Sequence, residues 1–255
     1  MTELRVQQDI RRELLRIVKD TQEFTVNIAN PGVLTTLSPH GFITGNQVFL
    51  STTGALPTGL QSSVLYYVIN ITSNTLQLAT TRSEALAGTG IETTGTESGA
   101  HAISSYLFVQ PDINDIAIPN GAVIIEDWMS VLNAPNENSP YAIIDSSDIM
   151  KAKGVQTNDG SFQWNIPLSI IETFVDYQIT RPKLRRDRQF VIDTLSKPNL
   201  YDNASGILAF GIRSIETKTP IFDILDRYDK PENIRDRYPI YIGQTINISV
   251  EEKSV

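Results

Sequence analysis

The residue types that carry most enzyme chemistry are scarce in this sequence. It has two histidines, His40 and His101, and no cysteine. Neither histidine lies in a nucleophile-elbow context, since no G-x-S-x-G motif occurs, and His40 sits in a Pro-His-Gly turn. Without cysteine there is no disulfide, thiolate metal site or cysteine nucleophile. We therefore expect no catalytic residue, no cofactor and no metal, and a protein that is not an enzyme.

Paired carboxylates are the other candidates for acid–base chemistry. Asp145 and Asp148, and likewise Glu126 and Asp127, are close enough in sequence to act together as general acid and base. In an acidic chain such pairs are also expected on the surface, which is the interpretation we favour. The run Gly88-Thr89-Gly90 lacks the strand-to-helix context and the third glycine of a dinucleotide-binding loop.

The strongest local charge pattern is basic, in a chain of formal net charge −8 and pI near 4.8. That balance argues against wrapping nucleic acid through its phosphates. The basic cluster, at residues 181–188, could meet an acidic surface of a neighbouring subunit or DNA passing nearby. It could also be a solvated loop partly paired to Asp187 and Asp193. As a hypothetical subunit interface we take the cluster and one aromatic anchor: Arg181, Lys183, Arg185, Arg186, Arg188 and Trp164.

Apolar spacing predicts the helices and strands that position these residues. Residues 3–20 carry apolar side chains three and four apart, which predicts an amphipathic N-terminal helix. A second helix is expected over residues 186–195, where the basic cluster straddles its start. Strands are expected at residues 122–126, 141–145, 161–177, 207–217 and 241–251, and the alternation in residues 162–170 and 242–250 predicts one buried face.

The composition changes sharply inside the chain. Residues 25–110 hold 4 charged side chains out of 86: Arg82, Glu84, Glu92 and Glu97. Short β-rich runs separated by Gly and Pro turns predict a small antiparallel barrel or sandwich there. The fold class expected is α+β: an antiparallel sheet packed with an N-terminal and a second helix, formed by residues 1–24 plus 110–255, and interrupted by an inserted all-β module at residues 25–109.

Two resemblances add to this interpretation. Residues 29–33, 39–45, 52–60, 66–69 and 74–80, in that order, resemble a small β module widespread in phage virion proteins. This resemblance implies a component of a virus particle.

The flanking part is similar in layout to phage tail-terminator, or tail-completion, proteins. The similarity covers a helix opening with residues 2–5, a strand at 140–144, a long strand at 164–175, a helix at 186–195 and a closing strand at 246–252. It implies a ring, usually a hexamer, that sits on the last ring of the tail tube, stops its polymerisation and offers its other face to the head connector.

These expectations define partners and location. The partners would be further copies of the chain, the tail tube protein and a neck or connector protein, with DNA only passing through the lumen and no membrane contact. The protein would be made in the host bacterial cytoplasm and reside in the virion, in the tail or neck. Two alternatives stay open: a baseplate, collar or fibre-attachment protein, and a carbohydrate-binding adhesin module, for which Tyr66 and Tyr67 are the adjacent aromatics in the insert.

Overall fold

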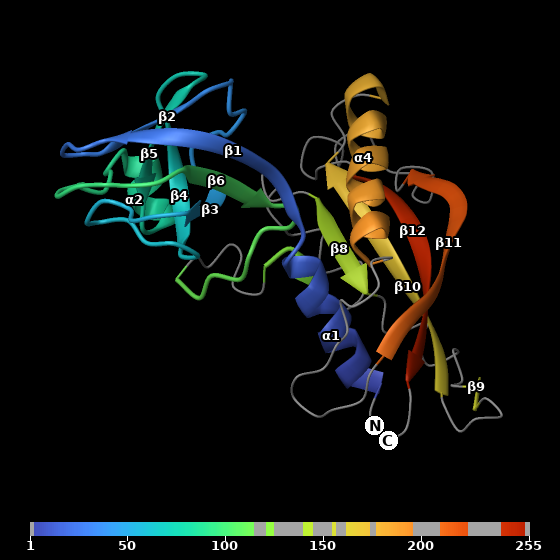
Figure 1. Cartoon of the computed structure of the whole chain (residues 1–255). Coiled ribbons are helices and arrows are strands. Elements are labelled where there is room, and N and C mark those ends of the chain that lie inside the picture. The colour runs from blue at the N-terminus through green and yellow to red at the C-terminus, as the bar shows by residue number, and fades with distance from the viewer. Residues whose placement is uncertain are drawn as a thin grey trace. The chain divides into compact units, whose positions relative to one another are not determined.

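The protein has a mixed α+β fold with a closed β-barrel (Figure 1). The computed structural model describes residues 3–114, 121–124, 140–144, 155–156, 162–173, 177–195, 210–223 and 241–252. The chain divides into two compact units, the barrel unit of residues 18–119 and an α+β unit of residues 1–17 and 120–255. The barrel unit is therefore inserted in the sequence of the α+β unit after its first helix.

Six antiparallel strands close the barrel in the order β1-β2-β5-β4-β3-β6, with β6 pairing back to β1. The strands are β1 (Val18–Asn27), β2 (Val33–Thr36), β3 (Gln47–Thr52), β4 (Leu65–Asn70), β5 (Thr75–Ala79) and β6 (His101–Tyr106). The expectation of a small antiparallel barrel or sandwich thus resolves to a closed barrel. Closure leaves no unpaired strand edge among these six strands.

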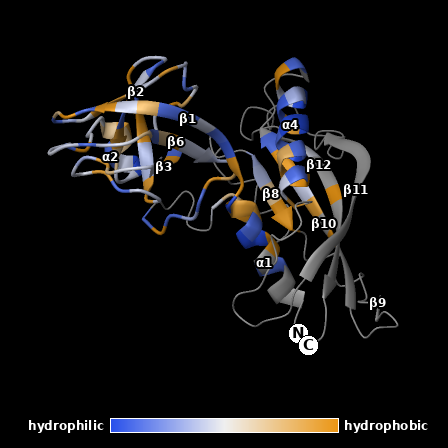
Figure 2. Cartoon of the chain, viewed as in Figure 1, coloured by the Kyte–Doolittle hydropathy of each residue, from blue (hydrophilic) through white to orange (hydrophobic). Residues whose placement is uncertain are grey.

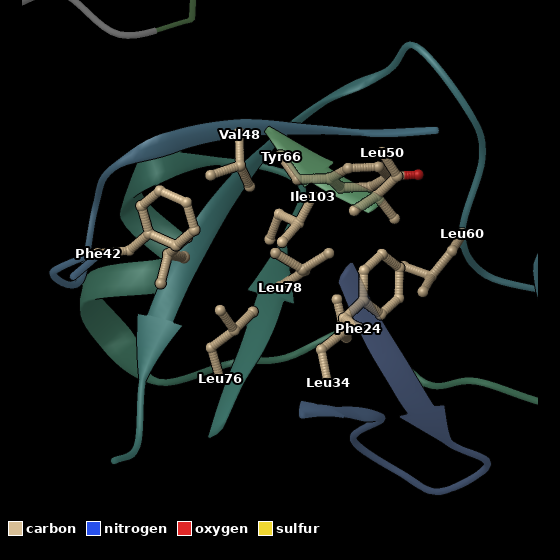
Figure 3. Packing of buried hydrophobic residues seen from close by; sticks show 11 residues of the cluster. Phe24, Leu34, Phe42, Val48, Leu50, Leu60, Tyr66, Leu76, Leu78 and Ile103 are labelled. Carbon is tan, nitrogen blue, oxygen red and sulfur yellow. The ribbon is translucent and has the colours of Figure 1, made fainter. Parts of the chain in front are cut away.

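Alternation along the strands fills the barrel interior. Tyr66 and Val68 of β4 point into the main core, together with Val48, Leu50, Leu78 and Ile103 (Figure 3). The intervening Tyr67 and Ile69 face outward, where Ala85 of helix α2 (Arg82–Ala87) covers them. Burying an aliphatic side chain of this size stabilises a fold by about 1.5–3 kcal/mol.

The sequence boundary of the insert falls inside a strand. The composition changes near residue 25, but β1 begins at Val18 and carries the charged residues Lys19, Asp20 and Glu23. One face of a barrel strand meets solvent, so the charge content of β1 does not reveal that it belongs to the barrel. The N-terminal helix is correspondingly shorter than expected, ending at Leu15.

The α+β unit is built on one sheet with strand order β11-β12-β10-β8-β7, and β9 pairs with β10. Its strands are β7 (Val123–Ile124), β8 (Tyr141–Ile144), β9 (Val155–Gln156), β10 (Phe162–Thr173), β11 (Phe210–Asp223) and β12 (Tyr241–Glu252). The pair β7–β8 is parallel and the other pairs are antiparallel. The sheet is therefore mixed, not purely antiparallel as the sequence suggested.

Two longer helices belong to this unit. Helix α1 (Glu3–Leu15) contacts β7, and Arg11 Nε donates to the Val123 carbonyl at 2.8 Å. Helix α4 (Tyr177–Leu195) contacts β10 and β12. No helix within the described ranges combines the length and the apolar character needed to cross a membrane.

Helix α4 begins nine residues before the position predicted from sequence, at 177 instead of 186. The predicted strand at 161–177 accordingly ends at Thr173. Pro182 lies inside the helix as its sixth residue, so it removes one backbone donor and biases a sequence-based assignment towards a later start. The buried positions Thr180 and Leu184 flank it, and this buried stripe compensates for the lost hydrogen bond.

Candidate functional site

Helix α4 separates its residues by polarity, as Figure 2 shows in bands of hydrophobic and hydrophilic colour. Its buried positions are Thr180, Leu184, Asp187, Val191 and Leu195, spaced four, three, four and four apart. That spacing forms one stripe along a helix, and it faces the sheet strands β10 and β12. The basic residues lie on the remaining faces.

The structure brings the five basic residues of the predicted interface onto this single helix. Arg181, Arg185 and Arg186 are exposed, whereas Lys183 and Arg188 are half-buried. The prediction that they straddle the start of a helix was wrong, because they lie in the interior of α4. Trp164 of the same predicted set is in β10, opposite Val250 of β12, and its side chain lies outside the described part of the structure.

A buried carboxyl pair lies between α4 and the sheet. Glu172 of β10 and Asp187 of α4 are both 0% exposed. Lys183 Nζ donates to Glu172 Oε2 at 2.7 Å, and Arg186 Nε is 3.5 Å from Asp187 Oδ1, which is longer than a hydrogen bond. The helix is therefore attached to the sheet through ionisable groups at the centre of a mainly apolar stripe.

One shared proton satisfies two of the three buried carboxyl oxygens that lack a hydrogen-bond donor. When both carboxyls are ionised, Glu172 Oε1 and both Asp187 oxygens have no hydrogen-bond donor. The pKa of Glu172 is raised to about 8, mainly because burial penalises the ionised form, and a hydrogen bond with Asp187 raises it as well, while Lys183 opposes the rise. The raised pKa favours the neutral form of Glu172, which donates a hydrogen bond to one side-chain oxygen of Asp187.

The buried pair was not among the carboxylates singled out from the sequence. The predicted pairs Asp145 with Asp148 and Glu126 with Asp127 lie outside the described residues. Glu172 and Asp187 are 15 positions apart, and only the reversal of the chain between β10 and α4 brings them together. One signal in the sequence could have pointed to this buried pair. Asp187 occupies a position of the buried stripe between Leu184 and Val191, where an apolar residue is expected.

Both histidines lie in the barrel unit and are buried. Phe42 N donates to His40 Nδ1 at 3.0 Å, and His40 Nε2 donates to the Thr72 carbonyl at 3.0 Å. These contacts use both ring nitrogens, so His40 joins the loop after β2 to the turn between β4 and β5. It lies in an irregular loop, where the sequence predicted a turn residue.

His101 forms a row of hydroxyl, imidazole and carboxylate. Its Nδ1 is 2.8 Å from Thr52 Oγ1, and its Nε2 donates to Glu97. Such a row resembles the arrangement that activates a nucleophile. Thr52 Oγ1, however, also accepts from Gly54 N at 3.0 Å, and this anchors the hydroxyl in the loop after β3. The row therefore ties the loop after β3 to the segment before β6.

A third polar cluster fixes the chain where it leaves β6. The Gln47 side chain accepts from Gln110 N at 2.6 Å and donates to the Gln110 carbonyl at 3.2 Å. Tyr67 donates to Asp112 and receives a hydrogen bond from Gln47 Nε2 at 3.1 Å. The segment after β6 is thus held against β3 and β4 by paired donors and acceptors.

The described residues form neither a metal cluster nor a phosphate-binding loop. Within the described ranges, no three His, Asp or Glu side chains come together in a way that could hold a metal ion. Gly88 ends helix α2 in the left-handed conformation at φ 73°, so the Gly88–Gly90 turn follows a helix and does not precede one.

No family model matches this chain, and no curated protein matches it. The function proposed below therefore depends on the fold and the side chains of the chain itself.

Proposed function

We propose that this chain is a structural protein of a tailed-phage particle that forms a ring, terminates the tail tube and joins it to the neck or head connector. It acts through surfaces and not through catalysis. Terminating a polymer requires one face that binds the tube and a second face that cannot accept another tube ring. This proposal concerns the α+β unit, with the barrel unit as an insertion.

The order of elements in the α+β unit is the observation that carries the proposal. Helix α1, strand β8, long strand β10, helix α4 and closing strand β12 follow the layout of tail-terminator proteins. The barrel enters this order directly after α1. The elements on both sides of this insertion of about 100 residues complete one layout. We therefore interpret the α+β unit as a single ancestral domain into which the barrel was inserted.

The sheet offers a surface suited to ring formation. Strand β11 has 14 residues and, among the described strands, pairs only with β12. A strand at a sheet edge presents backbone donors and acceptors to another chain. A contact between two different surfaces of identical subunits closes into a ring when the rotation between them allows it.

The net charge of −8 fits a ring around a DNA channel, because a negative lumen lets DNA slide without adhering. The subunit number favoured by the resemblance is six. Location in the virion, contact with the tube protein and contact with a connector protein belong to the same proposal.

A baseplate, collar or fibre-attachment role in the same kind of particle is the second candidate function. The resemblance of the β module supports this role as much as it supports the tail-terminator role. The adhesin alternative is weakened by one observation. Tyr66 is 3% exposed inside the barrel and Tyr67 is 1% exposed beneath α2, so neither offers a face on which a sugar could stack.

Immunogold electron microscopy of intact particles tests the proposal. Antibody against this chain is expected to label the junction of head and tail, and antibody against the tube protein serves as the control for access along the tail. Label confined to the distal tip would overturn the terminator assignment in favour of a baseplate or fibre-attachment role. Particles without any label would overturn the virion assignment.

A further inference from the structure

Four exposed aliphatic side chains lie at one end of the barrel. The loop from β2 to β3 and the turn from β4 to β5 share this end, because β2 pairs antiparallel with β5 and β3 with β4. Helix α2 reaches the same end, since Leu86 Cδ2 lies 3.9 Å from the position that a Cβ atom would take at Gly45. We define the apolar tip by these four residues and their exposed fractions: Leu37 78%, Ile43 58%, Ile71 48% and Leu86 61%.

Hydrogen bonds hold the two loops of the apolar tip together. His40 N donates to the Ser73 carbonyl at 2.9 Å, and His40 Nε2 donates to the Thr72 carbonyl at 3.0 Å. The buried ring of His40 also stacks on Phe42, with 5.5 Å between the ring centroids. The exposed aliphatic side chains are thus carried by a preorganised framework, and preorganisation lowers the entropy that a contact costs.

The loops of the apolar tip carry no charge. Residues 36–46 and 70–75 contain no Asp, Glu, Lys or Arg, and the charged residues of α2, Arg82 and Glu84, are half-buried. Since residues 25–110 hold one basic and three acidic residues, the rest of the chain holds 20 basic and 26 acidic residues, a net charge of −6. The apolar tip is therefore a part of this acidic chain that another copy can approach without repulsion between like charges.

The chemistry of the apolar tip favours a second copy over other partners. A charged protein surface would lose its hydration against the tip without gaining an ion pair. Membrane-binding loops are typically basic or bear aromatic side chains at the interface, whereas these loops have no basic residue and Phe42 points into the barrel core (Figure 3). An identical apolar tip, by contrast, supplies the same uncharged aliphatic surface, and the contact is then self-complementary.

We infer that two copies of this chain associate through their apolar tips in a two-fold symmetric contact. The exposed aliphatic surface is on the order of a few hundred Å² per copy, a patch size that in soluble proteins marks an interaction site. A standard stable interface buries about 800 Å² per partner, so the dimer should be weak and depend on protein concentration. The contact belongs to the barrel unit and is independent of the ring contact proposed for the α+β unit.

Sedimentation of the purified full-length protein over a range of concentrations tests the contact. Association in pairs is expected, and it should persist at about 0.5 M salt because the apolar tip has no charge for salt to screen. Leu37→Asp should weaken the association constant at least about tenfold, since the two-fold axis places both new carboxylates in one contact. The matched control is Ile28→Asp, at an exposed position beyond the opposite end of β2, which should associate as the wild type does.

Cross-linking gives a second measurement that holds even if Leu37→Asp fails to fold. Because the chain has no cysteine, Leu37→Cys introduces a single exposed thiol, which a short bifunctional maleimide can join to the thiol of a second copy. Cross-linked dimers are expected for Leu37→Cys and not for the control Ile28→Cys.

Three results would overturn the inference. One is a wild-type protein that stays monomeric at every concentration, together with equal cross-linking of the two cysteine variants. Another is a folded Leu37→Asp variant that associates as strongly as wild type. The third is a monomer that binds phosphatidylcholine vesicles and loses this binding in Leu37→Asp, which would assign the apolar tip to a lipid surface.

The failure of this contact differs from the failure of the proposed function. Particle labelling reports where the protein resides and is independent of the residues that join the barrels. A labelled head–tail junction together with a monomeric purified protein would refute only the role of the apolar tip.

Discussion

Replacing Glu172 by glutamine should remove a pH dependence from the stability of the α+β unit. The folded pKa of Glu172 is raised to about 8, above its ordinary value of 4.5. Between these two pH values the folded chain keeps a proton that the unfolded chain has released. The stability contributed by the protonated pair is therefore complete below about pH 4.5 and is lost as pH rises towards 8.

The size of the effect follows from the same two values. One pH unit of difference corresponds to about 1.4 kcal/mol, so the interval from 4.5 to about 8 sets an upper limit of about 5 kcal/mol for the loss in unfolding free energy. This pKa already contains the opposing effect of Lys183, whose ammonium contacts Glu172 Oε2. Measured from about pH 5 to about pH 8, which is only part of this interval, the loss should be about 2–4 kcal/mol.

Urea unfolding followed by tryptophan fluorescence measures this directly. Both tryptophans, Trp128 and Trp164, belong to the α+β unit, so their signal is separate from the unfolding of the barrel. The unfolding free energy of the wild type should fall from about pH 5 to about pH 8, whereas Glu172→Gln should give a nearly flat profile, because the amide donates to Asp187 at every pH.

Asp193→Asn is the control on the same helix, since Asp193 is exposed and should leave the wild-type slope intact. A wild-type profile that is flat over this range, or a Glu172→Gln profile that retains the wild-type slope, would refute the shared proton.

Three further predictions concern the barrel unit, and each is checked by measuring the hydrogen-exchange rates of its backbone amides. Leu78→Ala should lower the stability of the barrel unit by about 2–5 kcal/mol, because the leucine fills the barrel core and its truncation leaves a cavity. An unchanged stability would mean that Leu78 is not packed in the core. Thr81→Ala removes the N-cap of α2 and should cost about 1 kcal/mol, whereas Thr81→Ser should cost much less. His101→Phe should speed exchange at the Gly54 amide, which donates to Thr52 Oγ1, because it breaks the contact between His101 and Thr52. An equal exchange rate of this amide in both proteins would contradict that role.

The barrel was the part of the fold best predicted from sequence. Its strands are short β-rich runs separated by turn residues, so residues such as Val48, Leu50, Val68 and Leu78 could be assigned to strands without a structure. The strand order and the closure through β1 and β6 could not, because pairing between strands distant in sequence leaves no local signal.

The α4 region shows the limits of sequence patterns for the candidate site. Pro182 obscured the start of the helix, and the basic residues were therefore assigned to a loop boundary. The pair of Glu172 and Asp187 depends on how α4 turns back onto β10, and no motif specifies that reversal. A buried aspartate in an apolar stripe was the one local clue to it.

The pairing of β1 with β6 has a consequence for how the barrel unit is inherited. Val18, the first residue of β1, lies opposite Tyr106, the last residue of β6. Paired residues of neighbouring antiparallel strands are about 5 Å apart, so the chain enters and leaves the barrel strands at almost the same point. A module with adjacent ends and its own closed core can be spliced into a surface turn of an unrelated host without stretching that turn. Recombination between genomes could therefore transplant it as a cassette, and the host domain would keep its own sheet.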